Sequence, residues 1–282
     1  MEPRSWQDPP EYRGGGMGLA VPSLTPAVKL LLIVNGVVFL FFFLVLDSIK
    51  QPNVEMQAIQ LFALSPERWK AWFPLVPVWQ LVTYGFMHGS FQHILYNMLG
   101  LYFLGTMLEG IIGTRRFMVF YLLAVVVAGF AQLMLSLAFD REPAPILGAS
   151  GGVLAVICAM ATLRPATRMI LIIFPLTLRT LALIWVASDL FTLIRQFQGQ
   201  ESNVASFAHL TGAALGFAAV RTGWIWRDPV QLVEGARARR ADLSEAESRA
   251  RLDALLAKIA KEGIGSLTGR ERSFLKKMSK RR

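Results

Sequence analysis

Long apolar runs separated by short polar segments dominate residues 28–220. A helix rises about 1.5 Å per residue, so about 20 apolar residues cross a hydrocarbon layer of about 30 Å. The pattern therefore predicts an all-α, polytopic membrane protein. Its six predicted transmembrane helices are 28–46, 91–108, 117–138, 150–164, 180–197 and 204–220. Residues 169–178 are also apolar, but this run is too short to cross and contains Pro175.

Residues 47–89 form a long connection between the first two predicted helices. The segment mixes tryptophans with charged residues, a composition typical of chains that lie in the membrane interface. Pro66, Pro74 and Pro77 interrupt it, because proline removes a backbone donor and breaks a continuous helix. We therefore expect an interfacial segment that is not one single helix.

Composition and charge agree with a membrane protein. Hydrophobic residues make up 54% of the chain and charged residues only 17%, which excludes an ordinary soluble domain. The net charge of +10 comes largely from the end of the chain, so it does not indicate a nucleic-acid interface. Because basic loops face the cytoplasm, Arg115, Arg116, Arg164 and the basic tail predict cytoplasmic termini. We expect a protein of the bacterial inner membrane.

Three regions follow from this pattern. Residues 1–27 lack the basic start and apolar stretch of a signal peptide and predict a flexible cytosolic segment. Residues 28–221 form the predicted membrane domain, and residues 222–282 a basic cytosolic tail of helices. In the tail, capping-box patterns at Ser244 and Thr268 predict two helix starts.

Polar side chains in three predicted helices are the candidate functional residues. His93 and Asn97 share one face of the second helix, Ser150 begins the fourth, and His209 lies in the sixth. These three helices run in the same direction. Ser150 lies roughly 21 Å from the inner end of its helix, hence roughly 10 Å below the outer surface, at a depth comparable to that of His209. A neutral histidine can take the proton of a serine hydroxyl, so the pattern predicts a serine–histidine dyad.

Glycines beside these residues allow close helix approach. Gly148 and Gly151 flank Ser150, while Gly212 and Gly216 lie on the His209 side of the sixth helix. Small residues also mark ordinary packing in membranes, so packing and catalysis both remain open interpretations here. His209 and Asn97 are likewise open to a structural role through interhelical hydrogen bonds.

Two further residues define what the site contains. Asp189, in the fifth predicted helix, is an ionisable group that could orient His209. Its helix runs the opposite way and places it near mid-membrane, so we favour a structural or neutral, protonated role. Cys158 is the single cysteine, which excludes an intrachain disulfide and a multi-cysteine metal site. No metal and no cofactor are predicted.

Three motifs give the chain a family resemblance. They are HGSFQHILYNM at 88–98, GASG at 148–151 and AHLTG at 208–212, followed by Gly216. With these motifs the chain resembles rhomboid intramembrane serine proteases over roughly residues 28–221. The resemblance implies that Ser150 is the nucleophile and His209 the general base, without a required acidic partner. It implies that His93 and Asn97 support the oxyanion hole, and that the substrates are transmembrane proteins cut in or next to their membrane helices.

Two alternatives stay open. One is a non-catalytic rhomboid-like protein that escorts membrane proteins, against which the presence of Ser150 and His209 argues. The other is a small transporter or proton relay built on His93, Asn97, His209 and Asp189. The lipid bilayer is the surrounding medium in each case, and the sequence indicates no particular oligomeric state.

Overall fold

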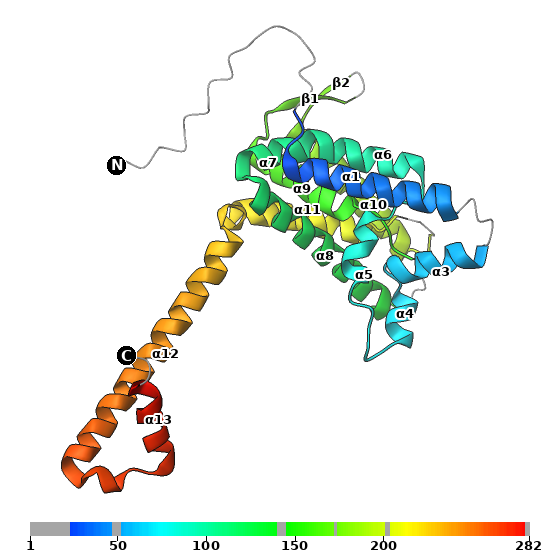
Figure 1. Cartoon of the computed structure of the whole chain (residues 1–282). Helices are drawn as coiled ribbons and strands as arrows, with labels where there is room; N and C mark the ends of the chain where they lie inside the picture. The colour runs from blue at the N-terminus through cyan, green and yellow to red at the C-terminus, as the bar shows by residue number, and fades with distance from the viewer. Residues whose placement is uncertain (1–22, 47–51, 140–144, 172–173, 201–203, 280–282) are drawn as a thin grey trace. The chain divides into compact units, whose positions relative to one another are not determined.

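The structure, a computed structural model, describes residues 23–46, 52–139, 145–171, 174–200 and 204–279 (Figure 1). The predicted N-terminal segment 1–27 therefore lies mostly outside the described residues. The chain divides into two compact units, residues 1–225 and 226–282. The first contains the apolar helices and the second the basic tail.

Helices form over all six apolar runs. They are α1 (Pro26–Leu40) with its continuation η1 (Phe41–Leu46), α6 (Phe91–Gly100) with η3 (Leu101–Gly105) and α7 (Thr106–Ile112), α8 (Thr114–Ala138), α9 (Ser150–Leu163), α10 (Leu178–Phe197) and α11 (Ser206–Arg221). The described residues are predominantly helical, as predicted, with one two-stranded hairpin as an exception. Within the part of the chain that the structure describes, three helices are long and apolar enough to cross a membrane, over Pro26–Phe43, Phe91–Ile112 and Thr114–Ala138. Six crossings remain a prediction.

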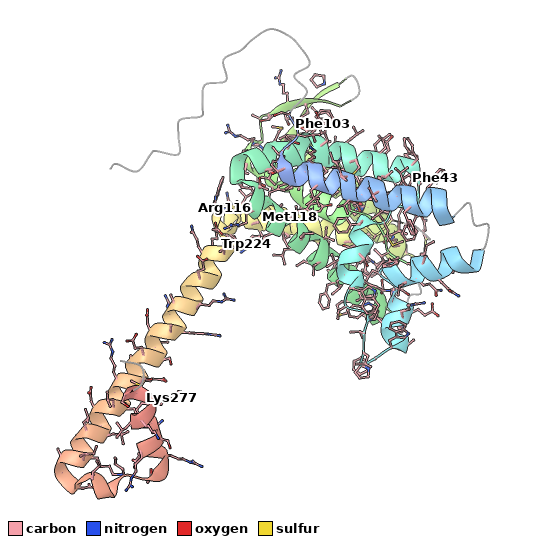
Figure 2. The ribbon with its side chains drawn as sticks, viewed as in Figure 1. Phe43, Phe103, Arg116, Met118, Trp224 and Lys277 are labelled. Atoms are coloured by element: carbon pink, nitrogen blue, oxygen red, sulfur yellow. The ribbon has the colours of Figure 1, made fainter. Side chains whose placement is uncertain are left out.

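Several described side chains on the surface of these helices are large and apolar. Phe43, near the far end of the first helix, is 58% exposed, and Phe103 of η3 is 37% exposed (Figure 2). Such exposed apolar residues suit contact with lipid tails. The face toward the bundle is instead buried, as Val28 and Leu31 of α1 are.

The second apolar helix is longer than predicted, because it continues to Ile112 through Glu109. Glu109 is only 2% exposed, yet its carboxylate is well satisfied. It accepts hydrogen bonds from the backbone amides of Ala27 and Val28, both at 2.9 Å, and from the Thr114 hydroxyl at 2.7 Å. These amides start α1 and lack intrahelical partners, so a carboxylate is favourable there.

Helix α9 lies in the core of the first unit and packs against α8, α10 and α11. Every residue from Gly151 to Ala161 is buried. The helix has only 14 residues and is shorter than the three spans named above. Its first residue, Ser150, is half-buried, and the buried part of the helix begins directly after it.

The connection between the first two spans consists of short helices, as its prolines predicted. They are α3 (Pro52–Phe62), α4 (Pro66–Ala71), α5 (Gln80–Thr83) and the 3₁₀ turn η2 (Tyr84–Phe86). The buried Gln80 side chain holds the segment together, accepting from the Ser65 amide at 3.2 Å and donating to the Gln60 carbonyl at 2.8 Å. Leu64 forms an isolated antiparallel bridge with Ile146, which leads into the loop before Ser150.

A β-hairpin occupies most of the short apolar run before α10. Strand β1 (Arg168–Leu171) pairs antiparallel with β2 (Phe174–Thr177), with Arg168 opposite Thr177 and Leu171 opposite Phe174. The sequence excluded a crossing helix here but did not predict strands. Pro175 is compatible with an edge position in a sheet of two strands.

The tail consists of α12 (Pro229–Glu262), the 3₁₀ turn η5 (Ile264–Ser266) and α13 (Gly269–Ser279). The predicted helix start at Ser244 is wrong, because α12 begins at Pro229, capped by Asp228, whose carboxylate accepts from the Val230 amide at 2.9 Å. The residues between Pro229 and Ser244 are rich in Ala and Arg, which favour helix, so α12 continues through Ser244 without a break.

The second predicted capping box does form at the start of α13, which carries Lys277 in its last turn (Figure 2). Glu271 accepts from the Thr268 amide at 2.6 Å, and Lys258 of α12 donates to Glu271 at 3.1 Å. The Thr268 amide, and after it Lys258, lower the pKa of Glu271 to about 2. Among the described side chains of the tail, Leu255 of α12 and Leu267, just before α13, are the buried apolar residues.

Candidate active site

Ser150 owes its position to the tight turn that precedes α9. Gly148 has φ of +127°, which side chains rarely adopt, and its amide donates to the Tyr84 carbonyl at 2.9 Å. The Tyr84 hydroxyl in turn donates to the Val125 carbonyl of α8 at 2.6 Å. The turn therefore fixes where α9 starts, and Ser150, as its first residue, has a backbone amide without an intrahelical partner.

Glycines bring α11 against α9 at backbone contact. A Cβ atom added to Gly212 would lie 2.0 Å from the Gly151 carbonyl oxygen, and one added to Gly216 would lie 2.1 Å from that of Ala155. No side chain fits at either position. Gly151 itself has no room, because its Cβ would lie 2.7 Å from that of Ala128. Gly148 differs from these three glycines, since it lies in the turn before the helix.

His209 projects from the first turn of α11 toward Ser150. Its Nε2 lies 2.6 Å from the Ser150 Oγ, within hydrogen-bond distance. The two residues are 59 positions apart in the sequence, so the contact depends on the close α9–α11 approach. A hydroxyl next to an imidazole nitrogen is the arrangement in which a histidine can activate a serine nucleophile.

Asp189 of α10 also reaches His209, a contact that the sequence offered as a possibility but did not favour, because Asp189 was expected near mid-membrane. Its Oδ1 lies 2.9 Å from His209 Nδ1, and the carboxylate is buried. Near the end of α10, Gln196 donates to the carbonyl of Val204, which lies just before α11, at 2.8 Å.

The His93 ring lies near the serine, across Gly148. The Cβ position of Gly148 is 2.7 Å from two atoms of the His93 ring and 3.6 Å from Ser150 Oγ. His93 also contacts the His88 ring, with centroids 5.0 Å apart. Asn97, one turn further along α6, is buried and donates to the His93 carbonyl at 3.0 Å.

Gln132 of α8 is a residue of the site region that the sequence analysis missed. Its side-chain oxygen accepts a hydrogen bond of 3.1 Å from the Ala208 amide, next to His209. Ala208 is the third residue of α11, so its amide has no intrahelical acceptor. The sequence did contain a signal for Gln132, because it is a polar residue inside the apolar run 117–138. Among the described residues, no group of three metal-ligating side chains could hold a metal ion.

The first unit has the features of a known class of membrane protein. The rhomboid domain family matches residues 77–225, more than half of the chain, and the chain belongs to this family. The family resemblance seen in the sequence is thereby confirmed, and the protein is an integral membrane protein of the rhomboid family. Residues 243–281 of the tail match a family of unknown function (DUF6576).

One curated relative carries a more specific name. The rhomboid protease GlpG of Enterobacter sp. (strain 638) is 30% identical over 145 residues. The aligned part is 50% of this chain and 47% of the relative, so the chain spans about half the length of that relative.

Proposed function

We propose that the chain is an intramembrane serine endopeptidase that cuts substrates in or next to their transmembrane helices. The distance of 2.6 Å between Ser150 Oγ and His209 Nε2 carries this proposal. Ser150 is the nucleophile and His209 the general base. Membership of the rhomboid family and the likeness to a relative named as a protease support the same activity.

The proposed reaction proceeds in two acyl-transfer steps. Ser150 Oγ attacks the scissile carbonyl carbon while its proton passes to His209 Nε2. The imidazolium then gives this proton to the leaving amine, and the peptide bond breaks. Water, deprotonated by His209, hydrolyses the acyl-enzyme and restores the serine. No metal or cofactor takes part.

Negative charge develops on the carbonyl oxygen during each attack and requires donors already in place. We assign this role to the Ser150 backbone amide at the start of α9, together with the side chains of His93 and Asn97. The position of the His93 ring next to Gly148 and Ser150 supports the assignment. Gly148, Gly151, Gly212 and Gly216 serve as the packing residues around this centre.

The proposed arrangement in the membrane has six crossings. Residues 28–221 form the membrane domain, with segments 1–27 and 222–282 on the cytoplasmic side of a bacterial inner membrane. The excess of basic residues in the tail supports this orientation. Ser150 then lies below the outer surface, where a substrate helix must unwind locally because its carbonyls are otherwise hydrogen bonded.

The decisive experiment compares the purified full-length wild type with Ser150→Ala and His209→Ala. Each variant is incubated in detergent with a transmembrane test substrate that carries helix-breaking residues near the cut. We expect cleavage by the wild type and a loss of at least about 10³-fold in kcat/KM for each variant. Cleavage that persists in either variant would overturn the dyad. A transporter or proton relay would instead be indifferent to Ser150→Ala.

Asn97→Ala tests the oxyanion assignment separately. Loss of one preorganised donor lowers kcat by roughly tenfold or more, with the amount of folded protein unchanged. Initial rates at saturating substrate measure this effect. A kcat equal to that of the wild type would remove Asn97 from the site and leave it as a helix-packing residue.

A further inference from the structure

A buried carboxylate extends the Ser150–His209 contact to a chain of three side chains. Asp189 Oδ1 is 2.9 Å from His209 Nδ1, and His209 Nε2 is 2.6 Å from Ser150 Oγ. The side chains of His209 and Asp189 are only 13% and 8% exposed. The second carboxylate oxygen, Asp189 Oδ2, is buried without a hydrogen-bond partner among the described residues. His209 is therefore the partner toward which this carboxylate is directed.

The position of Asp189 on α10 makes a carboxylate unexpected there. Four residues of α10 are buried: Leu178, Leu181 and Ala182 near its start, and Asp189. Burying a carboxylate with one oxygen unpaired costs free energy, and an apolar side chain would fill the same place at lower cost. A residue that breaks a local rule of this kind marks a functional position more often than a structural one.

The effect of the carboxylate follows from the two nitrogens of the imidazole. A neutral imidazole carries one proton, and only the form protonated on Nδ1 leaves Nε2 free to accept the Ser150 proton. An ionised Asp189 accepts a hydrogen bond from Nδ1–H and so favours this form. When Nε2 takes the serine proton, the positive charge of the imidazolium lies beside the carboxylate and is stabilised.

We propose that Asp189 is a positioning residue that holds His209 in its base-competent tautomer, so that Ser150, His209 and Asp189 act as a triad. This inference rests on the proposed endopeptidase function. It differs from the dyad that the family resemblance implies, because there no acidic partner is required. The competing explanation is purely structural: Asp189 would be a clasp that attaches the second half of α10 to α11.

Two substitutions separate these explanations in the full-length protein. Asp189→Asn keeps the shape and an oxygen acceptor for Nδ1–H but removes the charge, and we expect kcat to fall about tenfold or more. Asp189→Leu removes charge and acceptor together, and we expect a fall of about 10²-fold or more. KM stays within about twofold of the wild type in both variants, since neither touches the substrate. Ser188→Ala, the neighbouring polar residue on α10, is the matched control and keeps the wild-type kcat.

Thermal unfolding in detergent supplies a second measurement. Asp189→Asn keeps an acceptor for the buried Nδ1–H of His209, so its Tm should stay close to that of the wild type while kcat falls. A clasp predicts the opposite: a lower Tm, with kcat per folded molecule unchanged.

The outcomes are distinct from those that test the proposed function. If Ser150→Ala and His209→Ala abolish cleavage but Asp189→Asn retains wild-type kcat, the triad is overturned and the dyad stands. If cleavage survives in Ser150→Ala, the proposed function itself fails. If Asp189→Leu does not fold, Asp189→Asn decides alone.

Discussion

Helix α11 meets α9 at backbone contact, whereas the hydrogen bond between His209 and Asp189 joins it to α10. At the first interface Gly212 and Gly216 leave no room for even a methyl group. At the interface with α10, Asp189 is the buried residue of α10 beyond Ala182. Large apolar side chains elsewhere on α10 are exposed. The proposed nucleophile and base therefore lie on two helices that are locked together, whereas the proposed positioning acid lies on a helix held more loosely.

This difference separates what must be rigid from what can shift. The backbones that carry Ser150 and His209 cannot shift relative to one another without disturbing the tight contact between α9 and α11, and such an interface transmits strain rather than absorbing it. A displacement of the second half of α10, where Asp189 is the buried residue, would break the His209–Asp189 hydrogen bond and less buried packing than a displacement of α9. We therefore expect α9 and α11 to respond to substitution far more strongly than α10.

The largest effect is expected from Gly212→Ala. The added methyl group would lie 2.0 Å from the Gly151 carbonyl oxygen, so α9 and α11 must separate. We expect a loss of about 3 kcal/mol or more in the free energy of unfolding, and loss of proteolysis because Ser150 and His209 move apart. Unfolding in detergent and substrate cleavage measure the two quantities.

Gly36→Ala on α1 is the matched control for this substitution. A Cβ at Gly36 meets nothing within 4 Å. Alanine favours helix over glycine by roughly 0.5–1 kcal/mol, so this variant should be as stable as the wild type or slightly more so. Equal stability of the Gly36 and Gly212 variants would show that the α9–α11 contact is not tight.

The next effect contrasts two leucines, Leu154 of α9 and Leu183 of α10. Leu154 is 3% exposed and Leu183 is 60% exposed. Leu154→Ala leaves a cavity and should lower the free energy of unfolding by about 2–5 kcal/mol. Leu183→Ala should stay within about 0.5 kcal/mol of the wild type. Similar losses in both would indicate that α10 is as firmly packed as α9, which would break the comparison.

How much of this could be read from the sequence differs between the two interfaces. The α9–α11 contact followed from local signals: small residues at helical spacing, and polar residues at a common depth in helices that run the same way. The Asp189–His209 contact did not, because its level depends on where the chain turns between α10 and α11.

The remaining differences have similar causes. The strands at Arg168–Leu171 and Phe174–Thr177 show no alternation of apolar and polar residues, so the pattern could not distinguish them from a short buried run. The early start of α12 reflects helix propensity, which overrode an internal capping pattern at Ser244. The second predicted helix ended at residue 108 because Glu109 is charged. Its hydrogen-bond partners on α1 are far away in the chain, so the sequence pattern did not reveal them.

The smallest effect concerns the third neighbour of α11, where Gln132 of α8 accepts from the Ala208 amide. Gln132→Met removes the acceptor at similar size and leaves this amide unpaired, which should lower the free energy of unfolding by about 1 kcal/mol. Because His209 follows Ala208 directly, kcat should fall as well, by less than about tenfold.

Gln196→Met is the matched control. It removes an exposed hydrogen bond between α10 and the segment before α11, and we expect the free energy of unfolding to change by less than about 0.5 kcal/mol. If the Gln196 variant proved the less stable of the two, α10 would hold α11 more firmly than α8 does. The inference that α10 is the loosely held neighbour of α11 would then be wrong.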